Sequence, residues 1–285
     1  HKAIECASQL GIKHIRFTGG EPTVRKGLLS LIERTAQTPG IESVALTTNA
    51  ILLPGMAADL KAAGLSRVNI SLDTLDTEQY RFITRLGNLD DALKGIKAAL
   101  SAGLFPVKLN TVVVRSLNQD LLSFARLTVD APLHVRFIEY MPIGNGDDCG
   151  GCGWGPADVV PAKEIIETIS AQAQSIGLGS LQPAIATPDG WGPAQYYRLP
   201  GAQGTVGVIS AISNHFCASC NRLRLTADGK IKPCLFSDTE YDIRSALRKG
   251  SEEEVLSVFK AALFHKPSGH EHRVGTRRMM SQVGG

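Results

Sequence analysis

Three cysteines in the last third of the chain could hold a metal centre, namely Cys217, Cys220 and Cys234. The first two form a CxxC pair, a spacing that lets two thiolates reach one metal centre from a tight turn. The runs on either side of residues 227–229 are typical of a β-hairpin, which would return Cys234 to the pair. The sequence therefore predicts a three-thiolate metal site.

Three thiolates do not decide which metal is bound. A structural zinc ion is normally held by four protein ligands, so zinc would need a fourth one here. His215 and the Cys149–Cys152 pair are the candidates for that ligand. The alternative is an iron–sulfur cluster with three cysteine ligands and one iron that is open to another ligand. From the spacing alone, the two interpretations are equally good.

Two arginines that follow the CxxC pair indicate an anionic ligand. Arg222 and Arg224 alternate along an expected strand, so both side chains point to one face. Guanidinium groups bind phosphate through directional, charge-assisted hydrogen bonds. The sequence thus predicts a phosphate or a similar anion beside the metal centre.

The remaining cysteines carry weaker signals. Cys149 and Cys152 form a second CxxC pair in a glycine-rich loop, which could bind a metal or form a labile disulfide. An insertion without a catalytic role is the favoured interpretation of that loop. Cys6 lies on the apolar side of the first expected helix and is interpreted as a small core residue.

Alternating strand and helix patterns fill the first half of the chain. The expected strands cover residues 14–18, 44–48, 67–72, 107–114 and 135–140, and the expected helices cover residues 1–10, 27–36, 54–63, 89–102 and 118–128. This alternation predicts parallel β-α units, which fit a (β/α) barrel or a doubly wound sheet equally well. Polar residues then favour the barrel, because such barrels place their sites at the carboxyl ends of the strands. These polar strand ends are residues 18–21, 47–49, 71–73 and Glu139.

The pattern changes at about residue 147, where glycine and proline become dense. A helix is expected over residues 161–175, and short strands are expected over 196–199, 206–209 and 223–226. We therefore predict an α/β chain with two domains. Residues 1–150 form a partial (β/α) barrel, and residues 151–285 form a smaller C-terminal domain.

Composition excludes several classes of function. The net charge of +3 is mild and the basic residues are scattered, which argues against nucleic-acid binding. There is no apolar run of membrane-spanning length and no signal-peptide pattern, so a cytoplasmic protein without membrane association is expected. Paired cysteines in such a chain indicate metal or redox chemistry more than a disulfide framework. The chain starts with His1 inside an expected helix, so we expect further residues upstream.

Several segments together resemble the radical S-adenosylmethionine (SAM) superfamily and, more narrowly, its GTP 3′,8-cyclase family, which begins molybdopterin biosynthesis. The matching segments are residues 16–22 (RFTGGEP), 46–49 (LTTN), 69–73 (NISLD), 137–142 (FIEYMP), 216–236 and the terminal Gly284-Gly285. The GGEP motif indicates only the superfamily. The three-cysteine segment with its two arginines, joined to a Gly-Gly tail, is specific to the cyclases.

The resemblance implies an incomplete (β/α) TIM-type barrel whose open end is closed by a smaller C-terminal iron–sulfur domain. In that domain Cys217, Cys220 and Cys234 would hold a 4Fe–4S cluster, and its open iron would meet the guanine of GTP. The implied GTP contacts are Arg16, Thr47, Lys108, Arg222, Leu223 and Arg224, and the implied SAM contacts are Gly20, Ser71 and Met141. The tail residues that would reach the active site are Arg273, Arg277, Arg278, Gly284 and Gly285.

The same resemblance implies a mechanism that needs a second 4Fe–4S cluster. That cluster would reduce SAM to a 5′-deoxyadenosyl radical, which removes a hydrogen from the ribose C3′ of GTP so that C3′ attacks C8 of guanine. The product, (8S)-3′,8-cyclo-7,8-dihydroguanosine 5′-triphosphate, would pass to the next molybdopterin-pathway enzyme. The second cluster requires a CxxxCxxC loop, and this sequence contains none. We expect the first strand and this loop upstream of His1, and we expect residues 1–285 alone not to cleave SAM.

Two other functions compete with this interpretation. One is a non-catalytic nucleotide-binding protein with a structural zinc site. The other is a different radical SAM enzyme with an auxiliary cluster, such as a peptide-modifying enzyme, which should not bind GTP. The oligomeric state is left open, with a homodimer as one option.

Overall fold

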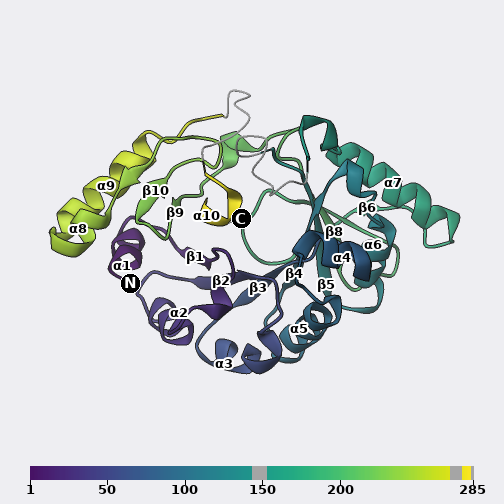
Figure 1. The fold of residues 1–285 in the computed structure, drawn as a ribbon, viewed down its shortest axis with the longest axis horizontal. Helices are drawn as coiled ribbons and strands as arrows, with labels where there is room; N and C mark the ends of the chain where they lie inside the picture. Colours follow the sequence, from purple (N-terminus) through teal and green to yellow (C-terminus); the bar gives the residue numbers. More distant parts are fainter. Residues whose placement is uncertain (143–152, 270–277, 284–285) are drawn as a thin grey trace.

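The computed structural model describes residues 1–142, 153–269 and 278–283, and its centre is a curved eight-stranded sheet (Figure 1). In spatial order the strands are β1 (His14–Phe17), β2 (Ser43–Thr48), β3 (Arg67–Ser71), β4 (Val107–Val113), β5 (Leu133–Glu139), β8 (Thr205–Ile209), β7 (Gln195–Arg198) and β6 (Gln182–Pro183). The first six of these run parallel, β7 pairs with β8 in the antiparallel direction, and β6 pairs with β7 in the antiparallel direction. The predicted α/β fold built on a parallel sheet is therefore confirmed.

Helices cover the outer side of this sheet (Figure 1). In chain order they include α2 (Leu28–Ala36), α3 (Ala57–Ala62), α4 (Thr77–Thr84), α5 (Leu89–Ser101), α6 (Leu121–Asp130) and α7 (Ala162–Ser175). Helix α4 was not expected, because Tyr80 is its only buried residue and an apolar stripe is therefore absent from its sequence. Its N-cap is Asp76, whose carboxylate accepts a hydrogen bond from the Gln79 amide at 2.7 Å. No helix within the described ranges is long and apolar enough to cross a bilayer.

The two faces of the sheet differ in chemistry with the period of two that a strand imposes. Every second residue of a strand packs under the helices in the main hydrophobic core, as Val68 and Ile70 of β3 do. The alternate residues lie on the concave face, where β3 places Arg67 and Asn69. The same alternation on neighbouring strands gives a concave face that is rich in charge.

Two carboxylates, the buried Glu139 and the half-buried Glu21, tie the carboxyl ends of the strands to neighbouring loops. Glu139, at the end of β5, is fully buried and accepts hydrogen bonds from the amides of Ala162 (2.7 Å), Ile212 (2.7 Å) and Ser213 (2.8 Å). Glu21 likewise accepts from the Thr48 hydroxyl (2.8 Å) and the Asn49 amide (2.7 Å). The polarity of these strand ends therefore serves the fold as well as a site.

The C-terminal part forms a second, smaller unit. Strands β9 (Arg224–Leu225), β10 (Lys230–Lys232) and β11 (Tyr241–Asp242) make an antiparallel sheet, followed by α8 (Arg244–Lys249) and α9 (Glu252–Phe264). Leu225 pairs with Ile231, so the predicted hairpin is confirmed.

A second hydrophobic core joins this unit to the start of the chain. Its members come mainly from α1 (Lys2–Gln9), β10, α8 and α9, and they include Cys6, Ile231 and Phe259. Cys6 is 1% exposed, which confirms its prediction as a core residue. The division of the chain near residue 150 stays a prediction, since strands from both sides of it share the large sheet.

We expect Glu139→Ala to lower the free energy of unfolding by about 3 kcal/mol, because three main-chain amides lose a charged acceptor. The measurement is the shift in thermal and urea unfolding midpoints. The matched control is Glu164→Ala, which removes an exposed carboxylate from Arg115 (2.7 and 2.8 Å) and should cost under about 1 kcal/mol. Equal shifts for the two variants would contradict this role for Glu139.

Candidate functional site

Four cations converge on the concave face of the large sheet. Arg16 lies on β1, Arg67 on β3, Lys108 on β4 and Arg136 on β5. Arg67, Lys108 and Arg136 are only 8%, 2% and 4% exposed, whereas Arg16 is exposed to solvent. Buried cations are rare in proteins unless something compensates their charge.

Burial and the proximity of the other cations lower the pKa values of Lys108 and Arg16. Burial, followed by the charges of Arg136 and Arg67, lowers the pKa of Lys108 to about 7. Burial and the charges of Arg136 and Arg222 lower the pKa of Arg16 to about 9, although its side chain remains in contact with solvent. Arg16 is thus surrounded by protein and still open to solvent, as expected for a residue that lines a concave surface. This surface would favour a polyanion.

The polar partners of these cations are mostly neutral oxygens. Arg136 donates through Nη2 to Oδ1 of Asn69 (2.7 Å) and through Nε to Oδ1 of Asn110 (2.8 Å). Lys108 donates to the main-chain carbonyl of Asp189 (2.6 Å), and Arg67 donates to the hydroxyl of Ser43 (3.2 Å). These bonds orient the side chains without neutralising them. The negative charge of Asp189 offsets the charges of Arg67 and Lys108 only in part, so positive charge remains available to a ligand.

A loop between β6 and β7 closes one side of this cation set. Besides the Asp189 carbonyl, it places Gly190 against the cations with a positive φ of 108°. A Cβ at that position would lie 2.8 Å from Nε of Arg67 and 3.2 Å from Nζ of Lys108. The next residue, Trp191, packs its ring 4.8 Å from the ring of His14 on β1. Glycine is therefore required where the loop meets the charged groups.

The cysteine-bearing hairpin brings two more cations to the same place. The charges of Arg222 and Arg224 both contribute to the lowered pKa of Arg16. Arg222 also lies over the ring of Phe216, 5.1 Å from its centroid. Residues more than 200 positions apart thus share one electrostatic environment, as the resemblance implied for a common ligand.

The three predicted metal ligands are half-buried free thiols at the two ends of this hairpin. Nζ of Lys266 lies 3.7 Å from Sγ of Cys220 and donates to the carbonyls of Arg222 (2.9 Å) and Pro233 (2.6 Å). Burial alone would raise the pKa of Cys220, but the Arg222 amide and the nearby cations outweigh it and lower that pKa. Within the described ranges no three His, Cys, Asp or Glu side chains are gathered tightly enough to hold one metal ion.

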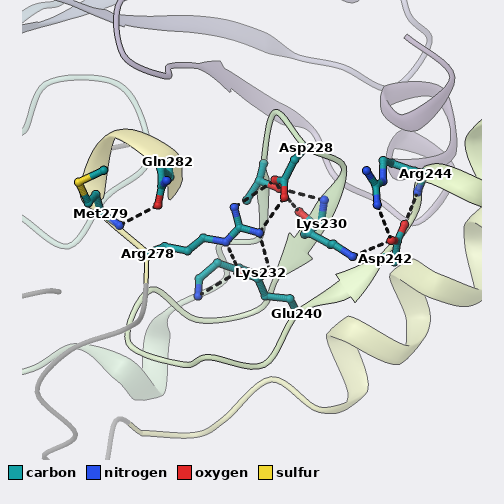
Figure 2. A network of polar contacts seen from close by, with 10 residues as sticks. Asp228, Lys230, Lys232, Glu240, Asp242, Arg244, Arg278, Met279 and Gln282 are labelled. Carbon is teal, nitrogen blue, oxygen red and sulfur yellow. Dashed lines mark hydrogen bonds and ion pairs between the residues drawn. The ribbon is translucent and has the colours of Figure 1, made fainter. Parts of the chain in front are cut away.

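The last described segment is tied to the hairpin by Arg278 (Figure 2). Its guanidinium donates to both carboxylate oxygens of Asp228 (3.1 and 2.9 Å) and to Glu240 (2.5 and 2.7 Å). Arg278 and Thr226 hold the pKa of Asp228 well below its usual range. Arg278 is therefore engaged in ion pairs with the hairpin and with the loop that follows it.

The structure places the other predicted contacts around the carboxyl ends of the strands. Thr47 is on the concave face of β2, Ser71 is the exposed last residue of β3, and Gly20 and Met141 follow β1 and β5. Leu223 instead packs against the second core. The predictions that lie outside the described residues concern Cys149, Cys152, Arg273, Arg277, Gly284 and Gly285.

The sequence analysis missed Arg67, Asn69 and Arg136 as site residues. Asn69 and Arg136 are each flanked by two residues of the hydrophobic core, and Arg67 is followed by Val68 of that core, so all three face away from it. A polar residue between two apolar ones on a parallel strand is the signal that the sequence carries for Asn69 and Arg136.

Comparisons with known proteins match the chain almost completely. The family model for the radical SAM superfamily matches residues 2–127, and the model described as Molybdenum Cofactor Synthesis C matches residues 133–272. A GTP 3′,8-cyclase from Pelotomaculum thermopropionicum is 50% identical over 286 residues, with 99% of this chain and 85% of the relative covered. The GTP 3′,8-cyclases of Heliobacterium modesticaldum (100% and 85% covered) and Moorella thermoacetica (98% and 84% covered) are also 50% identical.

We expect anion binding at the concave face to weaken as the pH rises through about 7. Below its folded-state pKa of about 7 the Lys108 ammonium is charged, and above it the amine is neutral. An anion that pairs with the charged form should therefore lose up to about tenfold in affinity per pH unit above 7. The measurement is the affinity for sulfate, whose own charge is constant, between about pH 6 and 8.

The matched control for that experiment is Lys108→Arg, which stays charged throughout this range. Its affinity profile should be flatter than that of the wild type. Identical slopes in the two proteins would show that Lys108 does not control the pH dependence.

Proposed function

The chain belongs to the GTP 3′,8-cyclase family of radical SAM enzymes in molybdenum cofactor biosynthesis, and we propose that GTP binds between its concave sheet face and the cysteine hairpin. The observation that carries this proposal is the convergence of Arg16, Lys108 and Arg136 with Arg222 and Arg224. A triphosphate has the charge and the length to engage cations from both places. Thr47 and Leu223 would contact the same nucleotide.

The cysteine hairpin would hold a 4Fe–4S cluster beside the guanine. The donor set fits such a group, because Cys217, Cys220 and Cys234 are half-buried free thiols and nearby cations lower the pKa of Cys220. In a cubane the cysteine sulfurs bind different irons, so they do not gather around one point as the ligands of a single ion do. Three cysteines leave one iron open, and the guanine would be its additional ligand.

SAM would bind at the carboxyl ends of the first strands. Membership of the radical SAM superfamily implies a 4Fe–4S cluster and SAM, which together supply the radical chemistry when they are bound. Gly20 is exposed and has open space around it, so its main chain can approach a ligand closely. Ser71 and Met141 would flank the same ligand from β3 and the end of β5.

The chain's own residues would position GTP and keep its phosphates fixed. Cations from the sheet and from the hairpin would hold the triphosphate from two sides. A fixed triphosphate restricts the position of the ribose that is joined to it. Helix α10 (Met280–Val283) follows the Arg278 anchor, and its Val283 is 3% exposed. We extend the proposal to Gly284 and Gly285, which follow this helix and would act at the active site.

The metal content tests the cluster assignment. After anaerobic reconstitution with iron and sulfide, we expect a brown protein with about four irons at this site. Cys217→Ser, Cys220→Ser and Cys234→Ser should each lose most of that iron, whereas Cys6→Ala should retain it because Cys6 lies in the core. One colourless zinc per chain, released by the same three substitutions, would instead establish a structural zinc site.

GTP affinity tests the substrate assignment. Arg222→Ala and Arg224→Ala should each weaken GTP binding by roughly 1.5–3 kcal/mol, the worth of a hydrogen bond to a charged group. Isothermal titration calorimetry on the reconstituted protein measures this effect. The matched control is Arg248→Ala, which removes an exposed cation of α8 and should leave the affinity unchanged. Unchanged affinity in both hairpin variants would disprove this placement of GTP.

A further inference from the structure

Asn69 on β3 carries a buried hydrogen-bond donor that the fold does not use. Its side chain lies in the middle of the concave face and the residue is 1% exposed. Among the described residues, nothing accepts a hydrogen bond from its Nδ2. A buried donor without an acceptor costs about 1–3 kcal/mol, so natural proteins rarely leave one unless a ligand completes it.

The orientation of this amide follows from its neighbour. Nη2 of Arg136 lies 2.7 Å from Oδ1 of Asn69, and a guanidinium can only donate. The amide oxygen must therefore face Arg136, and a flipped amide would place two donors against each other. Consequently Nδ2 is directed away from that guanidinium and remains free for another acceptor.

The neighbours of Asn69 define the acceptor. In the strand register Asn69 lies between Thr47 of β2 and Lys108 of β4, and Arg67 precedes it by two residues on the same face. Arg67 and Lys108 are buried cations, and Lys108 has its pKa lowered to about 7 partly by the other cations. Asp189 is an opposing charge near both residues, but Arg16 and Arg136 add to the cations, so an acceptor at this point lies in net positive surroundings. Such surroundings favour an anionic oxygen over a carbonyl or a hydroxyl.

We propose that Nδ2 of Asn69 donates a hydrogen bond to a phosphate oxygen of the bound nucleotide, which makes Asn69 a further binding residue. This inference rests on the proposed function, in which GTP occupies the concave face. An amide supplies a directional donor without adding a charge to a cation set that already repels itself. Because Arg136 fixes the orientation of the amide, its donor can hold one phosphate oxygen of the triphosphate in a defined position.

The test compares Asn69→Asp and Asn69→Ala with the wild type, using calorimetry with GTP and with inorganic tripolyphosphate. Asn69→Asp has nearly the same shape and still accepts from Arg136, but it has no donor. Both variants should weaken the binding of both probes by about tenfold or more, as expected for a charged hydrogen bond. The thermal unfolding midpoint of Asn69→Asp should equal or exceed that of the wild type, because a new ion pair replaces an unsatisfied group.

The matched control is Asn110→Asp, since Oδ1 of Asn110 accepts from Nε of the same Arg136 at 2.8 Å. It adds the same negative charge but leaves the Asn69 donor in place, so its loss of affinity should be clearly smaller. Equal losses for the two aspartate variants, or unchanged affinity in Asn69→Ala, would overturn the role of Asn69. A wild-type protein that binds tripolyphosphate but not GTP, or binds neither, would contradict the proposed function itself.

Discussion

Mutual repulsion among buried cations is the constraint on which the rest of this structure depends. Arg67, Lys108 and Arg136 are held within one concave surface by neutral oxygens, and burial lowers the pKa of each. The charges of neighbouring cations lower the pKa of Lys108 and of Arg136 further. Such an arrangement opposes folding, so the apolar face of the same strands and the helices above it must supply the compensating stability. A bound polyanion would reduce the repulsion among these cations, so ligand binding would stabilise the sheet.

The second requirement is that distant segments meet. The hairpin with Arg222 and Arg224 faces the sheet only because its small unit shares a hydrophobic core with α1 at the start of the chain. Lys232, which is fully buried in β10, donates to the Ser237 carbonyl and lies 3.7 Å from Glu240. Glu240 in turn pairs with Arg278, so the hairpin, the loop that follows it and the last helix are cross-linked by charge (Figure 2).

The sequence was sufficient for elements with a strong periodic signal. The five strands of the first half and the cysteine hairpin were predicted within one or two residues, because alternating burial and turn residues are encoded locally. Helix α4 was missed because it buries one residue, and Glu139 was interpreted as a site residue although its carboxylate holds three amides of distant segments. The contributions of Arg67, Asn69 and Arg136 depend on which strands become neighbours, and strand order is not a local property of the sequence.

Lys266 gives the cysteine hairpin a property that bears on how its metal centre would be assembled. By donating to the carbonyls of Arg222 and Pro233, its ammonium cross-links the strand that follows Cys220 to the residue that precedes Cys234. These two protein–protein bonds help to close the loop between the cysteines, so part of the entropy of closing it is lost during folding. Insertion of the proposed cluster would then resemble the binding of a ligand to a preorganised site more than the metal-driven folding of a zinc finger.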